Sequence, residues 1–264
     1  MRANVGEIEL YYELTGNEAG PVIVLTHGIG GSAHDFAPIV PALAERFRVL
    51  TYDVRGHARS GRPASGYTIT QLAQDLAGLL DALDIPQAII LGTSMGGTIA
   101  QRFILDFPEK TRAAIIMSTS SEVKPAAAER WQQMADEIER DGFAEYLRRT
   151  RPPMFTEEYL REHPEALESE RRRLANNPDS HVYAQIARAV SSYNYTQELD
   201  SVRVPALLLV GADDPMTPPG GAVIISRHIP NAELHILPGY GHNLTHQAPD
   251  EVVRLINDFV DRVG

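Results

Sequence analysis

A single hydroxyl stands between glycines in the stretch "LGTSMGG", which directly follows the apolar run "AIIL". Gly92 precedes Ser94 and Gly96 follows it, with one residue between the serine and each glycine. The stretch lacks the Gly-Lys-Ser/Thr ending of a P-loop and the G-x-G-x-x-G spacing of a dinucleotide-binding turn. It has instead the G-x-S-x-G pattern of a turn that presents a serine on a strained backbone, where small neighbours are needed. This pattern predicts that Ser94 is a nucleophile.

A serine nucleophile needs a base, and the base needs a group that orients it. His242 lies in the glycine-bounded stretch "GYGHNL", and Asp213 and Asp214 lie in "LLLVGADDPMTP". A carboxylate beside the imidazole would fix its tautomer and stabilise the imidazolium. The N–H of Met95, at the start of a helix, would point toward an oxyanion formed at Ser94. Together these residues predict acyl-transfer chemistry.

Short runs rich in Val, Ile and Leu must position these residues. They are "PVIVLTHG", "FRVLTYDVRG", "AIILGTS", "AAIIMSTS", "PALLLVGADD" and "ELHILPGYG". Their lack of polar alternation is typical of strands in a parallel sheet that is covered on both faces. Helical patterns lie between them; one ends near Phe107 before Pro108, and another begins at Pro249. The sequence predicts an α/β protein, with "EIELYYELTG" as antiparallel strand material at one edge.

The alternation of strands and helices breaks between about Lys124 and Val204, where only polar helical patterns occur. This length is too great for one crossover, so we expect a helical insertion over the carboxyl edge of the sheet, where ligands bind. The expected domains are a core of residues 1–123 and 205–264 and a cap of residues 124–204. Candidate substrate-binding residues in the cap are Trp131, Tyr146, Phe155 and Arg149. At helical spacing such aromatic residues more often form the insertion's own core, and clustered arginines more often form a solvated face.

Composition excludes several classes of function. The chain has 264 residues, of which 43% are hydrophobic and 22% charged, as is usual for soluble proteins. It has no cysteine, which excludes disulfides, thiol catalysis and cysteine metal sites. The net charge of −11 disfavours nucleic acid as a partner, and no stretch is apolar enough for a signal peptide or a membrane span. We expect a cytoplasmic protein with a small-molecule partner, and the sequence leaves a homodimer open.

Four motifs, in order along essentially the whole chain, resemble those of the α/β-hydrolase fold superfamily. "LTHGIGGS" resembles its oxyanion loop, and "YDVRGHARSGRP" resembles its Asp-x-Arg-Gly-His-Gly-x-Ser loop, with Ala58 in place of the second glycine. "GTSMGG" resembles the nucleophile elbow, and "GADDPMTP" with "GYGHNL" resembles the acid and histidine segments. The resemblance implies the α/β-hydrolase fold, with a mostly parallel eight-stranded sheet flanked by helices and an inserted helical cap.

The resemblance also implies a role for each matching residue. Ser94 matches the nucleophile and His242 the general base, and the family pattern selects Asp214 over Asp213 as the acid. The backbone N–H groups of Ile29 and Met95 match the oxyanion hole.

The remaining polar residues are assigned other roles. Loops are expected to be held by His27, Ser32, Asp53, Arg55 and His57. His242 and His246 are spaced as metal ligands on a helix can be, but the glutamate of H-E-x-x-H is absent, so no metal is expected. No cofactor is expected either. Thr93 is the one elbow residue that the motifs leave unexplained.

The resemblance implies a serine hydrolase of the carboxylesterase or lactonase type, similar to 3-oxoadipate enol-lactonases. Such an enzyme cleaves a carboxylic ester or lactone of a small organic substrate through an acyl-enzyme. One alternative is a carbon–carbon hydrolase of meta-cleavage products; those enzymes usually have Asn and Trp where this chain has Thr93 and Asn243. Others are a cofactor-free haloperoxidase or perhydrolase and, outside enzymes, a ligand receptor that keeps the triad. The serine at the elbow disfavours dehalogenases and epoxide hydrolases, which use aspartate there.

Overall fold

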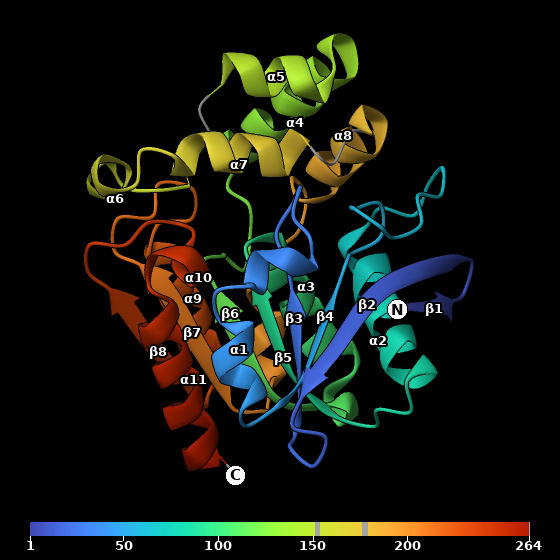
Figure 1. Cartoon of the computed structure of the whole chain (residues 1–264), viewed down its shortest axis with the longest axis vertical. Helices are drawn as coiled ribbons and strands as arrows, with labels where there is room; N and C mark the ends of the chain where they lie inside the picture. Colours follow the sequence, from blue (N-terminus) through green and yellow to red (C-terminus); the bar gives the residue numbers. More distant parts are fainter. Residues whose placement is uncertain (151–153, 176–178, 264) are drawn as a thin grey trace.

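A single sheet forms the centre of the computed structural model, which describes residues 1–150, 154–175 and 179–263. Within these residues the sheet has eight strands in the spatial order β1-β2-β4-β3-β5-β6-β7-β8 (Figure 1). The strands are β1 (Arg2–Val5), β2 (Ile8–Gly16), β3 (Val22–Thr26), β4 (Arg48–Tyr52), β5 (Ala88–Thr93), β6 (Thr111–Met117), β7 (Ala206–Gly211) and β8 (Ala232–Leu237).

Strand direction separates the N-terminal edge from the rest of the sheet. β1 pairs antiparallel with β2, and β2 pairs antiparallel with β4. The strands from β3 to β8 pair in parallel with their neighbours. The predicted α/β-hydrolase fold, with a mostly parallel eight-stranded sheet, is therefore confirmed within the described residues. The carboxyl ends of β5, β7 and β8 meet at one edge, and each is followed by a candidate site residue.

Helices flank the sheet. They are α1 (Val40–Ala44), α2 (Ile69–Ala82), α3 (Met95–Asp106), α9 (Gly220–His228), α10 (Leu244–Gln247) and α11 (Pro249–Val263). Short 3-10 helices span Ala33–Phe36, Pro108–Lys110 and Glu198–Ser201. The predicted end of α3 before Pro108 and start of α11 at Pro249 are confirmed. α2 begins after Thr68, whose side chain accepts a hydrogen bond from the backbone of Gln71 and so caps the helix.

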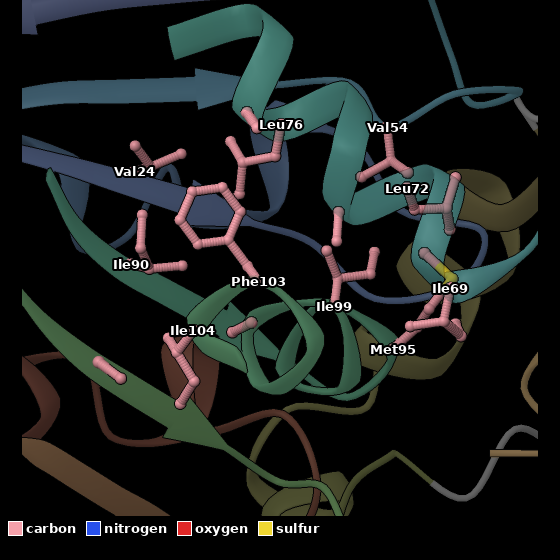
Figure 2. Close-up of a cluster of buried hydrophobic side chains, with 14 of the residues drawn as sticks. Val24, Val54, Ile69, Leu72, Leu76, Ile90, Met95, Ile99, Phe103 and Ile104 are labelled. Carbon is pink, nitrogen blue, oxygen red and sulfur yellow. The ribbon is translucent and has the colours of Figure 1, made fainter. Parts of the chain in front are cut away.

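Both faces of the sheet are buried because successive strand side chains point to opposite sides. In β3, Val24 packs into a cluster with α2, α3 and α9, whereas Ile23 and Leu25 pack into a cluster with α1, α10 and α11. Figure 2 shows the first cluster, where Val24 and Ile90 of the sheet lie near Leu76 of α2. Two buried faces explain why these strands read as continuous apolar runs.

Further helices lie between β6 and β7 in the sequence, and Figure 1 shows them gathered at one end of the sheet. These inserted helices are α4 (Pro125–Asp141), α5 (Phe143–Arg149), α6 (Glu157–Glu162), α7 (Ala166–Ala175) and α8 (Ser180–Ala189). They have a small buried core of their own, in which the rings of Phe143 and Tyr183 stack with centroids 4.0 Å apart. The division into core and cap at the stated residue numbers stays a prediction. Of the helices described, none is both long and apolar enough to cross a membrane.

Candidate active site

Ser94 lies at the turn between the end of β5 and the start of α3. Its backbone has φ 55° and ψ −121°, outside the regions that residues with a side chain ordinarily adopt. The Ser94 N–H donates to the carbonyl of Met117 at 2.9 Å, and the Ser94 carbonyl accepts from the N–H of Thr98 at 3.1 Å. Strain of this kind persists only where the surroundings hold it, and it concentrates at functional sites.

The glycines beside Ser94 provide clearance for closely approaching backbone. A Cβ atom on Gly92 would lie 2.0 Å from the carbonyl oxygen of Gly96, and one on Gly96 would lie 2.0 Å from the carbonyl oxygen of Thr26. Neither glycine has a positive φ, so the strained conformation belongs to the serine alone. The small neighbours that the motif calls for are therefore required by packing.

His242 follows β8, and its imidazole pairs with Asp214, which follows β7. His242 Nδ1 lies 2.8 Å from Asp214 Oδ2, and the side chains are 2% and 0% exposed. The carboxylate also accepts hydrogen bonds from the N–H groups of Met216 and Thr217, at 2.9 Å each, and from the Thr217 hydroxyl at 2.8 Å. Burial acts to raise the pKa of the Asp214 carboxyl, but the hydrogen bonds from His242 and Thr217 outweigh burial and hold the pKa below its ordinary value. Asp213 is exposed and does not contact the imidazole.

The second imidazole nitrogen, His242 Nε2, is buried and has no hydrogen-bond partner within the described residues. Ser94 and His242 line the same cavity. The backbone N–H groups of His242 and Asn243 donate to the carbonyl of Met154, at 3.1 and 3.2 Å. Met154 lies between α5 and α6, so the inserted segment holds the histidine loop in place. The structure thus leaves Nε2 available for a proton from the serine or from a water.

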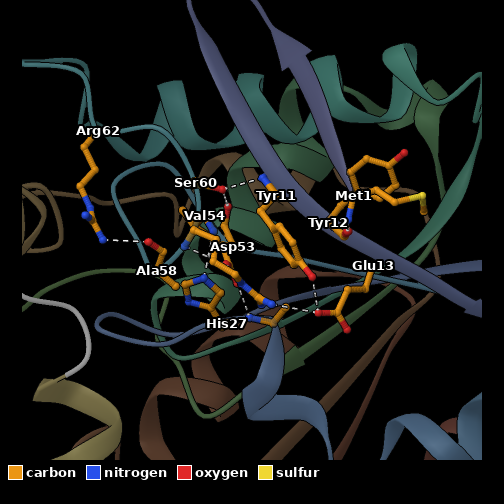
Figure 3. A network of polar contacts seen from close by, with 12 residues as sticks. Met1, Tyr11, Tyr12, Glu13, His27, Asp53, Val54, Ala58, Ser60 and Arg62 are labelled. Carbon is orange, nitrogen blue, oxygen red and sulfur yellow. Dashed lines mark hydrogen bonds and ion pairs between the residues drawn. The ribbon is translucent and has the colours of Figure 1, made fainter.

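Two buried imidazoles hold the loop that follows β3. His57 Nε2 accepts a hydrogen bond from the N–H of Gly30 at 3.0 Å, and His57 Nδ1 lies 3.0 Å from the carbonyl of Arg55. His27 Nε2 accepts from the N–H of Val54 at 2.9 Å, as Figure 3 shows. Burial, and after it the neighbouring His27, lower the pKa of His57 to about 3, so its ring is neutral. Neutral rings are needed here because each nitrogen that accepts must keep its lone pair.

Charged side chains reinforce the same region. Asp53 accepts from the N–H of Ala33 at 2.8 Å and from the N–H and Nε of Arg59 at 3.0 and 2.8 Å. Arg55, which is 1% exposed, binds both carboxylate oxygens of Asp75 at 2.6 and 2.8 Å. The contacts of Asp53, Arg55 and the two imidazoles are those of residues that hold loops, as the sequence indicates.

Two cavities meet at Ser94. The first cavity has a volume of about 480 Å³. The residues that line it and not the second cavity include Met95, Thr98, Thr119, Ser120, Tyr193 and Ile224. The second cavity has a volume of about 610 Å³. The residues that line it and not the first cavity include Thr93, Met134, Phe143, Tyr146, Tyr183 and His242. The residues common to both are Ile29, Ser94, Ala127, Arg130, Trp131 and Met216. These volumes suit small organic molecules that extend to either side of the serine.

Most of the residues predicted for the site come together around Ser94. Ile29 and Met95, predicted to form the oxyanion hole, both line the first cavity. Trp131 of α4 lines both cavities and Tyr146 of α5 lines the second. Thr93, unexplained by the motifs, lines the second cavity beside the serine.

Two of the predicted cap residues lie elsewhere. Phe155 stacks on Tyr159, with ring centroids 5.1 Å apart, and Arg149 pairs with Asp141 at 2.7 Å. Neither is among the described residues that line the cavities, so the site proposed below omits them. Sequence reasoning missed Arg130. Its spacing of three residues from Ala127 and four from Met134 is the signal that could have found it, since residues three and four apart share a helix face and all three line the second cavity from α4.

The histidine pair considered as metal ligands makes other contacts. His242 binds Asp214, and His246 Nδ1 lies 3.1 Å from Asn243 Oδ1. Among the described residues, no three or more His, Asp or Glu side chains are grouped so that they could hold a metal ion.

The sheet, the serine elbow and the buried His–Asp pair define a class of protein. The family model of the alpha/beta hydrolase fold matches residues 21–249, and the chain belongs to this family. It is an enzyme of the α/β-hydrolase class, as the sequence resemblance predicts.

Individual members of the family are similar to the chain over most of its length. The chain is 28% identical over 231 residues to 3-oxoadipate enol-lactonase 2 of Acinetobacter baylyi, and the alignment covers 88% of this chain and 85% of the relative. It is 28% identical over 255 residues to a putative carbamate hydrolase, RutD, of Caulobacter sp. That alignment covers 95% of this chain and 95% of the relative. Among solved structures, it resembles the enol-lactonase of Burkholderia xenovorans LB400 with a TM-score of 0.92 and 28% identity, over 99% of this chain and 100% of that one.

Proposed function

We propose that this protein hydrolyses a carboxylic ester or lactone of a small organic molecule through an acyl-enzyme on Ser94. One observation carries the proposal: a strained serine and an imidazole that is held by a buried carboxylate line the same cavity. In this proposal Ser94 is the nucleophile, His242 the general base and Asp214 the group that orients His242.

In the first half of the reaction, the Ser94 hydroxyl gives its proton to His242 Nε2 while Oγ bonds to the substrate carbonyl carbon. The carbonyl oxygen becomes an oxyanion, which the N–H groups of Ile29 and Met95 stabilise. A donor of this kind contributes about 3–4 kcal/mol to transition-state stability. The bond from carbon to the leaving oxygen then breaks, and that oxygen takes the proton from Nε2. The products are an alcohol, or the ring-opened hydroxyl of a lactone, and an acyl ester of Ser94.

In the second half, a water gives a proton to His242 Nε2 as its oxygen bonds to the acyl carbon. The Ser94–acyl bond breaks, Ser94 regains the proton and the carboxylic acid leaves. Asp214 remains ionised throughout, which the lowered pKa of its carboxyl favours, and it stabilises the imidazolium at each step.

The relatives support carbonyl attack as the shared chemistry. The relative named an enol-lactonase acts, by that name, on a lactone, which is a cyclic ester. The other is named a putative carbamate hydrolase, and a carbamate also has a carbonyl carbon that a nucleophile can attack. The order of the motifs around Ser94 and His242 supports the same reaction.

Hydrolysis of 4-nitrophenyl butyrate by the wild type and by Ser94→Ala tests the proposal. We expect the variant to lose at least about 10³-fold in kcat, the scale of other losses of a triad member, while circular dichroism shows unchanged folding. A fluorophosphonate should label the wild type and leave the variant unlabelled. If the wild type hydrolyses the ester no faster than Ser94→Ala and the fluorophosphonate does not label it, the proposed function is wrong.

A further inference from the structure

The Thr217 hydroxyl lies against both atoms that join Asp214 to His242. It donates a hydrogen bond to Asp214 Oδ2 at 2.8 Å, and its oxygen lies 3.3 Å from His242 Nδ1. His242 Nδ1 itself lies 2.8 Å from the same Oδ2. The three polar groups therefore form a closed triangle. The motifs that identify Asp214 and His242 assign no role to this hydroxyl.

The two oxygens of the Asp214 carboxylate are held differently. Oδ1 accepts hydrogen bonds from the backbone N–H groups of Met216 and Thr217, at 2.9 Å each. Within the described residues, Oδ2 contacts only the side chains of Thr217 and His242. The backbone bonds fix where the carboxylate lies, whereas the Thr217 hydroxyl acts on the oxygen that meets the imidazole.

A hydrogen bond donated to a carboxylate disperses its negative charge, so the carboxylate attracts a neighbouring cation less strongly. Burial acts to raise the pKa of Asp214, and the hydrogen bonds from His242 and Thr217 lower that pKa below its ordinary value. The bond from Thr217 also weakens the attraction of Oδ2 for an imidazolium. The contact of the hydroxyl oxygen with Nδ1 would act in the opposite direction, but at 3.3 Å it is the longer and weaker of the two.

We propose, resting on the hydrolase function proposed above, that Thr217 is a positioning residue that acts on His242 through Asp214. Its hydroxyl holds Oδ2 against Nδ1 and limits how strongly the carboxylate stabilises the imidazolium. The ring then releases its proton readily to the leaving oxygen. Without the hydroxyl, His242 binds a proton at higher pH and returns it more slowly.

Other titratable side chains surround the imidazole and are the same in a variant of Thr217. Those that line the second cavity with His242 are Asp35, Arg130, Tyr146, Glu170 and Tyr183. Those that line the first cavity with Thr217 include Glu122, Lys124 and Tyr193. Because all of these groups are present in the wild type and in the variant, a difference in pH dependence between the two reports the hydroxyl.

Thr217→Val keeps the shape of the side chain without its hydroxyl, and Thr217→Ser keeps the hydroxyl. The pH profile of kcat/KM for 4-nitrophenyl butyrate between pH 5 and pH 9 reports protonation of the base in the free enzyme. We expect Thr217→Val to move the acid limb of this profile upward by about half a pH unit, the scale of one modest hydrogen bond. At pH 8 kcat should fall about fivefold and KM should change less than about twofold. Thr217→Ser should keep the acid limb of the wild type.

Thr111→Val is the matched control. Thr111 is buried at the amino end of β6, away from the carboxyl ends that carry the site, and its hydroxyl donates to the carbonyl of Phe107 at 3.0 Å. This variant should keep both the acid limb and kcat.

Thr217 also lines the first cavity, so a contact with the substrate is the competing role. Loss of such a contact would change KM by different factors for 4-nitrophenyl acetate and 4-nitrophenyl butyrate and leave the acid limb in place. That result, or an acid limb that is unchanged or lowered while kcat falls, would overturn the positioning role.

An NMR titration of the His242 ring tests the same role without turnover. In the Ser94→Ala background, ring signals assigned with His242→Gln should titrate about half a pH unit higher when Thr217→Val is added. Equal titration would refute the role of Thr217 whether or not the enzyme is active. A wild type that hydrolyses neither ester faster than Ser94→Ala would refute the hydrolase function instead. If circular dichroism shows that Thr217→Val does not fold, Thr217→Ala replaces it in both experiments.

Discussion

Asp213 and Asp214 are adjacent carboxyl groups in very different surroundings. Asp214 is buried, accepts two backbone N–H groups and a hydroxyl, and lies 2.8 Å from His242 Nδ1. Asp213 is exposed, and its backbone N–H donates to the carbonyl of Tyr240. The residue types alone offer both carboxyl groups, whereas the family pattern selects Asp214. In the structure, the turn after β7 brings Asp214 to the imidazole.

Asp214→Asn should therefore lower kcat by about 10³- to 10⁴-fold, because an amide cannot stabilise the imidazolium or hold the required tautomer. Asp213→Asn, which makes the same chemical change at the neighbouring residue, should change kcat less than about threefold. Both are measured with 4-nitrophenyl butyrate at neutral pH. Comparable losses in the two variants would contradict the assignment of Asp214.

The difference between Arg130 and Arg149 shows what residue types alone do not determine. The cluster that includes Arg149 is conspicuous in the sequence, whereas Arg130 is a lone basic residue among alanines and acids. Which of them meets the site depends on how α4 and α5 pack, and the acidic side chains of the inserted helices occupy Arg149. The motifs around Ser94 and His242 could be recognised because the backbone geometry there restricts the local residue types. A side chain that lines a cavity from a helix is under no such restriction.

At the scale of elements, the approach of α3 to β3 and β5 fixes the serine turn. A Cβ on Gly96 would lie 2.0 Å from a backbone carbonyl of β3, which cannot move without shifting the strand. Gly96→Ala should therefore lower the free energy of unfolding by about 1–3 kcal/mol or more, as overpacking does, and lower kcat by displacing Ser94.

Gly220→Ala provides the comparison, because a Cβ at Gly220 would have no atom within 4 Å. This change, at the start of α9, should leave stability unchanged or raise it by up to about 1 kcal/mol. Urea unfolding followed by circular dichroism measures both variants. If Gly96→Ala unfolds at the same urea concentration as the wild type, the packing explanation for this glycine is wrong.

The strands and flanking helices could be predicted because their signals are local. Runs of Val, Ile and Leu give the parallel strands, and Pro108 and Pro249 mark helix ends. The N-terminal edge proved to be two strands, β1 and β2, because Gly6 adopts φ 55° and turns the chain between them. Contacts between distant segments, such as those of the Met154 carbonyl with the histidine loop, have no local signal and needed the structure.

At the scale of the whole molecule, buried groups with lowered pKa values link stability to pH. The pKa of His57 is lowered from 6.5 to about 3, so below about pH 6.5 the unfolded chain binds a proton that the folded chain does not. Stability therefore falls as the pH falls from about 6.5 toward 3. Burial opposes ionisation of Asp53 and Asp214, but hydrogen bonds outweigh it and hold both pKa values below 3.8. Their stabilisation is present above that pH and is lost only as the pH falls below it.

The interval between pH 7 and pH 5 separates the titration of His57 from that of Asp53 and Asp214, because these two carboxylates remain ionised there in both states. His57 alone should reduce the free energy of unfolding by about 2 kcal/mol over this interval. In His57→Gln the side-chain carbonyl can still accept a hydrogen bond from the Gly30 N–H, and the amide does not take up a proton. Between pH 7 and pH 5 the free energy of unfolding of this variant should therefore fall by about 2 kcal/mol less than that of the wild type, whatever its stability at pH 7. Urea unfolding at the two pH values measures the difference, and His163→Gln, at a half-exposed histidine, should behave as the wild type does. An equal loss in His57→Gln and in the wild type would show that the neutral His57 ring does not set the acid sensitivity of the fold.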